Sequence, residues 1–340
     1  MKVEERAQAP EAAAGTGVAD RLDRRWLGAL VAGVLIIALP PLVLDGVWND
    51  TLSLALLEGL MGLSIVVLTG YVGQLSLMPA TFVGVGAFVS ADLVSRLQTP
   101  FWGSVPLATL AAIPVALLIG MISLRLKGLY LAIMTLVFAD VGDQFLFKQS
   151  WFAGSGGSVD APRPKLWSID FNSDKSYYVL VGLACAVFVV LVWNFSRSRS
   201  ARACYAVRDN EPTAQAMGVN VAKYKLMAFA LSGLIAGFAG ALFAHWSGTV
   251  SAGGELPAFG LQFSLTIVFF TILGGVRSIA GPFLGAAIWV VLVNRLLNGS
   301  PNGQNIAFSI FGILVLLTML YRPQGLAGLG RNLLDRARTR

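Results

Sequence analysis

The stretch SRSRSARACYAVRDNEPTAQAMGVNVAKYK, residues 196–225, is the longest polar and charge-dense interval of this sequence. Its charged side chains are mostly basic: Arg197, Arg199, Arg202, Arg208, Lys223 and Lys225 stand against Asp209 and Glu211. The segments that flank it are apolar over about 20 residues each, which is the length of a membrane-spanning helix. The interval therefore indicates a water-exposed loop between two spans, and the charges elsewhere in the chain indicate on which side of the membrane it lies.

Composition places the whole chain among integral membrane proteins. Of its 340 residues, 56% are hydrophobic and 13% are charged, and the mean hydropathy is +0.72. A soluble domain is about 45–50% apolar and about 25% charged, so this chain would expose too much apolar surface in water. The net charge of +7 resides in short loops and at the termini, which does not indicate nucleic-acid binding. One histidine and two cysteines in different surroundings, Cys185 and Cys204, predict neither a metal site nor a disulfide, and no cofactor is expected.

The apolar runs predict an all-α polytopic membrane protein of about ten transmembrane helices. The predicted spans are 26–44, 51–69, a third that follows the glycine-rich interval 70–88 and ends near 95, then 102–124, 128–147, 177–195, 226–246, 259–273, 279–297 and 305–321. Residues 1–25 are rich in alanine and charge and are predicted to form a disordered tail. Residues 26–321 form the membrane domain, and residues 322–340 form a basic C-terminal tail.

The basic residues alternate in step with these spans. One side receives the N-terminal tail, Arg125 and Lys127, the interval 196–225, Arg277 and the C-terminal tail, whereas the other side receives mixed or acidic loops such as 148–175. By the positive-inside rule the basic side is cytoplasmic. Both termini and the interval 196–225 are therefore predicted to lie in the cytoplasm.

Glycines at four-residue spacing predict that the helices pack closely together. Gly233 and Gly237 form one such pair, and Gly281 and Gly285 form another. Small residues on one helix face let two backbones approach, which drives helix association in lipid. The spans are thus expected to form one bundle rather than separate anchors.

Sequence signatures of enzymes are missing from the chain. There is no G-x-x-x-x-G-K-[ST] phosphate loop, no G-x-S-x-G elbow and no H-E-x-x-H motif. Glu58 is the one acidic residue well inside a predicted span, so it is a candidate for a polar contact within the bundle. A secondary transporter that acts alone on an ion gradient would need such residues, and it is kept as the alternative function.

The glycine-rich interval GYVGQLSLMPATFVGVGAF, residues 70–88, is a candidate for part of a transport pathway. Broken, glycine- and proline-interrupted segments at membrane depth point to such pathways, because irregular backbone is tolerated there only next to protein or a cavity. The candidate pathway residues are Gly70, Gly73, Gln74, Ser76, Gly84, Gly86 and Glu58. A plain cytoplasmic turn between two spans is the alternative. GGVRSIAGPFLGAA, residues 274–287, has a similar character, so the chain is compatible with a weak internal repeat.

Within the interval 196–225, the residues favour a short helix that Pro212 ends or restarts and that Gly218 stops. Such a helix can lie on anionic lipid headgroups through its arginines. It can equally dock into a groove on a cytosolic partner. The spacing alone does not separate these two roles.

Five stretches together carry a resemblance to a known family. They are residues 70–88, RLKGLYLAIMTLVFADV at 125–141, the segment 202–244, TILGGVRSIAGPFLGAAI at 271–288 and YRPQGLAGL at 321–329. In this order they resemble the permease subunits of branched-chain amino-acid ABC importers, the LivM-type half, over residues 51–329. The resemblance implies a transport subunit without catalytic activity in the inner membrane of a bacterium.

The resemblance also implies partners: a second related permease, two cytosolic ATPase subunits and an extracytoplasmic solute-binding protein. It implies that residues 196–225 form a cytoplasmic coupling loop, which docks on an ATPase through the coupling residues Arg208, Asp209, Asn210, Glu211, Ala214, Met217 and Gly218. Movement of the ATPases is then expected to re-angle the spans 177–195 and 226–246 and to alternate the opening of the pathway. The family pattern has Gly-His where this chain has Met78 and Pro79, which leaves the solute open between a branched-chain amino acid and urea, a short amide or an aromatic acid.

Overall fold

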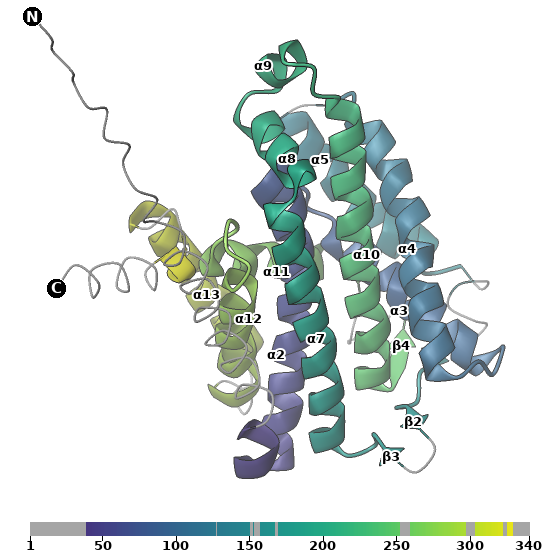
Figure 1. Cartoon of the computed structure of the whole chain (residues 1–340). Helices are drawn as coiled ribbons and strands as arrows, with labels where there is room; N and C mark the ends of the chain where they lie inside the picture. The colour runs from purple at the N-terminus through teal and green to yellow at the C-terminus, as the bar shows by residue number, and fades with distance from the viewer. Residues whose placement is uncertain are drawn as a thin grey trace, which may run out of the picture.

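The chain forms a helical bundle, shown in Figure 1 as a computed structural model. The structure describes residues 39–126, 128–149, 152, 157–166, 169–251, 259–296, 303–321 and 325–328. Within these residues five helices are long and apolar enough to cross a membrane: Gly46–Tyr71, Phe101–Ser123, Leu129–Leu146, Asp174–Arg197 and Val221–Ser247. An all-helical, polytopic membrane protein is thereby confirmed. The predicted N-terminal tail, most of the predicted C-terminal tail and most of the first predicted span lie outside the described residues.

The helical elements follow one another along the chain, and three of the apolar helices end in a short π-helical segment. The helices are α2 (Gly46–Ile65) with η1 (Val66–Tyr71), α3 (Pro79–Ser95), α4 (Phe101–Ser123), α5 (Leu129–Val141) with η2 (Gly142–Leu146), α7 (Asp174–Arg197), α8 (Arg199–Asp209), α9 (Glu211–Ala216), α10 (Val221–Ser247), α11 (Leu261–Gly274), α12 (Gly281–Val291) with η3 (Leu292–Leu296), and α13 (Gly303–Tyr321). Two short antiparallel strand pairs join β1 (Ser158–Asp160) to β4 (Thr249–Ser251) and β2 (Lys165–Leu166) to β3 (Ile169–Asp170).

Helix α10 forms the centre of the bundle and packs against α2, α3 and α4. Its glycine pair explains the close approach to α4, because Gly233 faces the Ala116 side chain and Gly237 faces Ala112. In α12, Gly285 lies against the backbone carbonyl of Phe270 in α11. The predicted role of these glycines in helix packing is confirmed.

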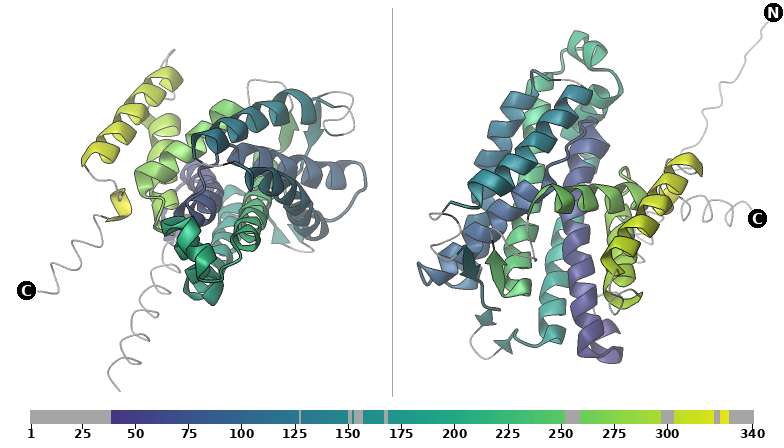
Figure 2. Two further views of the ribbon diagram at one scale, coloured as in Figure 1. Left: turned by 90° about the horizontal axis from the view of Figure 1, so that it is seen from above. Right: turned by 180° about the vertical axis from the view of Figure 1, so that it is seen from behind.

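Helix α11 does not run along the bundle with the others. Figure 2 shows it lying across the bundle at an intermediate height. It has 14 residues, which at 1.5 Å per residue gives about 21 Å, less than the roughly 30 Å of a bilayer core. The structure therefore has a short transverse helix where the sequence predicts a span over 259–273. The sequence of an apolar helix that is buried on several sides does not reveal how the helix is tilted relative to the bilayer.

Helices α3 and α12 both begin inside the bundle after an irregular, glycine-rich segment. Each has a proline in its first turn, Pro79 and Pro282, where a missing N–H costs nothing. The segment before α3 lies beside the interior of α5, since the backbone N–H of Leu77 donates to Thr135 Oγ1 at 3.0 Å. Helix α12 begins beside Gly62 in α2. This shared arrangement agrees with the weak repeat that the two glycine-rich stretches suggest.

The loops predicted to lie on the extracytoplasmic side come together at one end of the bundle. Strands β1 and β4, from two different loops, pair with each other. Arg163 bridges two helices, with 2.7 Å from Nη1 to Asp174 Oδ1 and 3.5 Å from Nη2 to Asp50 Oδ1. Trp246 Nε1 donates to the same Asp50 oxygen at 2.8 Å. The count of ten spans and the position of the termini stay predictions.

Candidate functional site

The polar interval 196–225 projects from one end of the bundle as two short helices, α8 and α9, between α7 and α10 (Figure 1). Ser198 caps α8 by accepting from the backbone N–H of Ala201 at 3.1 Å. Asn210 ends α8 and caps α9, accepting from the N–H of Thr213 at 3.0 Å. Gly218 follows α9 with a φ of +83°, which glycine adopts without strain. The helix restart at Pro212 and the stop at Gly218 agree with the prediction.

The interval has an inner face against the bundle and an outer face in solvent. Cys204, Val207 and Ala214 are buried on the inner face, and burial raises the pKa of the Cys204 thiol to about 11. Met217 at the tip of α9 is 80% exposed, although its side chain is apolar. Asp209 is also mostly exposed, at 68% of its side chain. Among the predicted coupling residues, a partner can thus reach Asp209, Asn210, Met217 and Gly218 directly.

Arg208 points into the bundle rather than toward solvent. Its Nη1 donates to the carbonyl oxygen of Gly70 at 2.8 Å, and its Nε donates to Asp209 Oδ1 at 3.0 Å. Its guanidinium also lies 5.4 Å from the centre of the Tyr205 ring. Burial raises the pKa of Tyr205, and the nearby Arg208 charge opposes this shift. The structure thus joins two predicted groups of site residues, the coupling loop and the glycine-rich interval.

Aromatic contacts hold the end of η1 against the same loop. The Tyr71 ring stacks on Phe195 of α7 with centroids 6.1 Å apart and meets Tyr205 of α8 edge-on at 5.4 Å. A π-helical turn is a common feature of functional sites, because its backbone leaves the regular α-helical hydrogen-bond pattern. Here the π-helix η1 ends where α7, α8 and the irregular segment 72–78 meet.

The irregular segment 72–78 contains two buried polar residues. Gln74 and Ser76 are each 6% exposed, and Gln74 Oε1 and Ser76 Oγ have no hydrogen-bond partner within the described residues. Gly73, with a φ of +76°, faces Arg208 Cγ, which lies 2.6 Å from where a Cβ would stand. The glycine at 73 therefore permits both the turn and the approach of Arg208.

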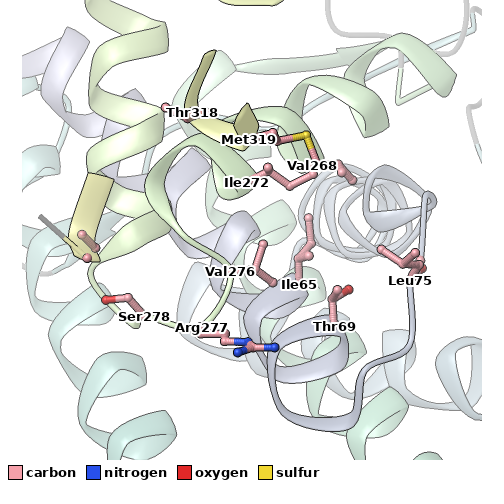
Figure 3. A pocket seen from close by; sticks show the side chains of 13 residues that line it. Ile65, Thr69, Leu75, Val268, Ile272, Val276, Arg277, Ser278, Thr318 and Met319 are labelled. Carbon is pink, nitrogen blue, oxygen red and sulfur yellow. The ribbon is translucent and has the colours of Figure 1, made fainter. Parts of the chain in front are cut away.

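Two cavities adjoin this segment. The first, termed the inner cavity, has a volume of about 700 Å³ and is lined by Ile65, Thr69, Leu75, Ser76, Val268, Ile272, Val276, Arg277, Ser278, Thr318, Met319, Ala327 and Gly328. Figure 3 shows Val268, Ile272 and Met319 together at one end of it and Thr69 and Arg277 at the other. Thr318 lies beside Met319, and Val276 and Ile65 lie near Thr69 and Arg277, so the lining combines apolar and polar side chains.

The second cavity, termed the loop cavity, has a volume of about 430 Å³ and lies between the segment 72–78 and the coupling loop. Gln74 and Arg208 both line it, together with Asn210 and Glu211. Only Leu75 of the segment lines both cavities. The segment 72–78 consequently forms the wall that separates the coupling loop from the inner cavity.

Three predicted pathway residues lie elsewhere. Gly84 packs against the Phe147 and Phe259 rings, and Gly86 packs against the Gly237 backbone, so both serve the contact of α3 with its neighbours. Glu58 is buried in α2 and does not line either cavity, and its Oε2 has no partner within the described residues.

Other residues of the site were not predicted from the sequence. Arg277 and Ser278 come from the second glycine-rich stretch, so the resemblance between the two stretches was a usable signal. Thr318 has no such signal, because a single threonine in an apolar helix commonly bonds to its own backbone, as this one does to the Val315 carbonyl at 2.8 Å.

Comparison with known proteins agrees with this architecture. Residues 48–320 match the family model described as branched-chain amino acid transport system / permease component. The high-affinity branched-chain amino acid transport system permease protein LivM of Escherichia coli K12 is 31% identical over 322 residues, which cover 88% of this chain and 74% of the relative. The autoinducer 2 import system permease protein LsrC of Enterobacter sp. strain 638 is 30% identical, covering 63% of each chain.

The LivH permease protein of the same E. coli transport system is more distant, at 23% identity over 56% of each chain. No solved structure matches the chain. The family model covers most of the sequence, including the coupling loop, both glycine-rich stretches and the residues of both cavities up to Met319. The chain therefore belongs to the family of permease components of branched-chain amino acid transport systems.

Proposed function

We propose that this chain is one permease subunit of a bacterial ABC importer and forms half of the pathway of a small polar solute across the inner membrane. The observation that carries the proposal is the position of the segment 72–78. It forms a wall of the inner cavity on one side and contacts the coupling loop on the other. Movement at the loop can thereby reach the lining of the cavity.

In this proposal the exposed tip of α9 is the contact with a cytosolic ATPase. An apolar Met217 that is 80% exposed on a helix surrounded by polar residues suits a hydrophobic groove on a partner. The alternative role, attachment to anionic lipid, would use the arginines at the start of α8 and would leave Met217 without a function. The docking residues of the proposal are Asp209, Asn210, Met217 and Gly218. Glu211 and Ala214 instead pack within the chain and stabilise the position of α9.

The inner cavity is proposed to be this subunit's share of the inner vestibule. Its hydroxyl groups and Arg277 can meet the polar groups of a solute, and Val268, Ile272 and Met319 can meet an aliphatic part. A branched-chain amino acid has both parts, and it is the solute named for the LivM relatives. A second permease related to LivH is proposed to complete the pathway, two ATPase subunits to drive it and an extracytoplasmic binding protein to deliver the solute. A polytopic topology with both termini in the cytoplasm completes this proposal.

The proposal is tested by reconstituting the chain with a LivH-type permease, the ATPase subunits and a solute-binding protein from the same organism. Vesicles that contain ATP should accumulate labelled leucine, isoleucine or valine, and vesicles without ATP should not. Unlabelled urea, a short amide and an aromatic acid, added as competitors, identify the solute class. Accumulation by the chain alone on a proton or sodium gradient would instead establish the secondary transporter. The supporting observation for that function is the buried Glu58, whose Oε2 has no partner within the described residues.

A further inference from the structure

Gly70 lies at a junction of three segments. Its carbonyl oxygen accepts from Arg208 Nη1 of α8 at 2.8 Å. Its Cα faces the carbonyl oxygen of Val276, so closely that a Cβ at this position would overlap that oxygen. One residue of η1 thus contacts both the coupling loop and the second glycine-rich stretch, whose Val276 and Arg277 line the inner cavity.

The contact between Arg208 and Gly70 is shielded and specific. The Arg208 side chain is 23% exposed, and its donors are directed to Gly70 and Asp209. A hydrogen bond from a charged donor is roughly twice as strong as a neutral one, and the fixed geometry of guanidinium gives it direction. Gly73 lies against the same side chain and leaves no room for a side chain of its own. The Arg208 side chain therefore extends from α8 and contacts both ends of the turn from 70 to 73.

We propose that Arg208 is a positioning residue that transmits movement of the docked coupling loop to the walls of the inner cavity through Gly70. This proposal rests on the proposed function, and it alters the route expected from the sequence, which is a change of angle of the spans 177–195 and 226–246. In the route proposed here, α8 moves the end of η1 directly. The segment 72–78 and the stretch around Val276 move with it, because they adjoin Gly70. Arg208 then acts inside the permease and not as a contact with the ATPase.

The test compares Arg208→Ala with Arg202→Ala in the complete reconstituted complex. Arg202 is an exposed arginine on the same helix, and the described residues give it no ion pair, so its removal controls for the loss of one positive charge. Arg208→Ala should still be recovered with the ATPase and should still hydrolyse ATP. Its solute uptake per ATP hydrolysed should fall at least about tenfold, the lower end of the loss expected for one charge-assisted hydrogen bond. Arg208→Lys, which keeps a charged donor, should fall between Arg208→Ala and the wild type.

Two results would overturn the proposal. Loss of the ATPase from the Arg208→Ala complex would show that Arg208 is a docking contact. An unchanged ratio of uptake to ATP hydrolysis would show that transport does not depend on the contact between Arg208 and Gly70. Hydrogen exchange of the isolated chain provides a second measurement: amides of residues 66–78 should exchange faster in Arg208→Ala and not in Arg202→Ala. Unchanged exchange in Arg208→Ala would also overturn the link. A wild-type complex that shows no ATP-driven uptake would overturn the proposed function itself, which separates the two failures.

Discussion

The ammonium group of Lys225 lies 3.0 Å from Glu211 Oε2 and closes the base of α9 against the first turns of α10. The Lys225 side chain is 5% exposed and that of Glu211 is 23% exposed, so this ion pair is largely withdrawn from solvent. Glu211 is one of the residues that the resemblance implies for docking on an ATPase, and its carboxylate is directed to Lys225 within the chain. The pair therefore sets the direction in which α9 presents Met217.

Lys225→Ala should loosen α9 without affecting insertion into the membrane. Removing one member of a buried ion pair leaves the other charge poorly solvated, at a cost of about 2 kcal/mol for a partly exposed partner. We expect faster proteolysis between α8 and α10 and lower recovery of the ATPase subunit. Lys223→Ala is the matched control, because Lys223 is exposed two residues earlier on the same helix. Equal recovery of the ATPase with both variants would contradict a bracing role for the pair.

Met217→Cys should report docking of the ATPase. The position is 80% exposed, so a maleimide should label the isolated permease rapidly. The native Cys204 is buried and its pKa is raised to about 11, which leaves almost no thiolate at pH 7 and makes it a silent background. Added ATPase should protect the introduced thiol from labelling. Labelling that stays equally fast in the assembled complex would place the contact elsewhere.

Met217→Asp gives the same docking contact a second readout. A charge at the tip of α9 should lower recovery of the ATPase at least severalfold if the partner offers an apolar groove, because burying an unpaired carboxylate is costly. Insertion and folding should be unaffected, since the side chain contacts mostly solvent. If binding to anionic vesicles falls and recovery of the ATPase does not, the tip belongs on the lipid surface.

Glu58→Gln separates the two candidate functions. Glutamine keeps the shape of the side chain and removes its ability to carry a proton or to neutralise a cation. An ATP-driven importer should retain most of its uptake, because the residue lines neither cavity. A transporter driven by an ion gradient should lose uptake almost completely. The measurement is initial uptake with ATP, with and without an agent that collapses the proton gradient.

Much of this architecture is predictable from the sequence, because apolar runs and charge alternation follow from the bilayer itself. The glycine pair at 233 and 237 also predicts a helix contact, although not the partner helix. The transverse position of α11 is not predictable in this way, since an apolar segment of that length can be buried in any orientation.

The candidate site is likewise predictable from the sequence in part. Polar residues among glycines identify the segment 72–78, and basic residues identify the coupling loop. Nothing in the sequence shows that Arg208 turns inward to Gly70, 138 residues earlier in the chain. The presence of a glycine likewise does not distinguish a residue of the pathway from a residue of a helix contact. For this reason the sequence predicts the same pathway role for Gly70 and Gly86.

Gly86→Ala should therefore reduce stability rather than select against a solute. A Cβ at this position would overlap the carbonyl oxygen of Gly237, so α3 and α10 would have to separate. Overpacking of this kind costs about 1–3 kcal/mol, which should lower the thermal unfolding temperature in detergent. Gly103→Ala is the control, because a Cβ at Gly103 in α4 meets nothing within 4 Å. If Gly86→Ala has a normal unfolding temperature and an altered solute preference, Gly86 is a pathway residue and not a packing residue.

Gln74→Leu tests the segment 72–78 as the moving wall of the pathway. Leucine has nearly the volume of glutamine, and the amide oxygen that it removes has no partner within the described residues, so folding and recovery of the ATPase should be unchanged. The backbone of the turn should also persist, because Thr69 Oγ1 donates to the carbonyl of residue 74 at 2.9 Å whatever the side chain. Uptake should nevertheless change, since the loop cavity loses a polar group beside Arg208. Gln144→Leu, at an exposed position near the opposite end of the bundle, should leave uptake unaltered. Loss of assembly in Gln74→Leu would show instead that the segment is a structural turn, and the pathway would then have to lie outside it.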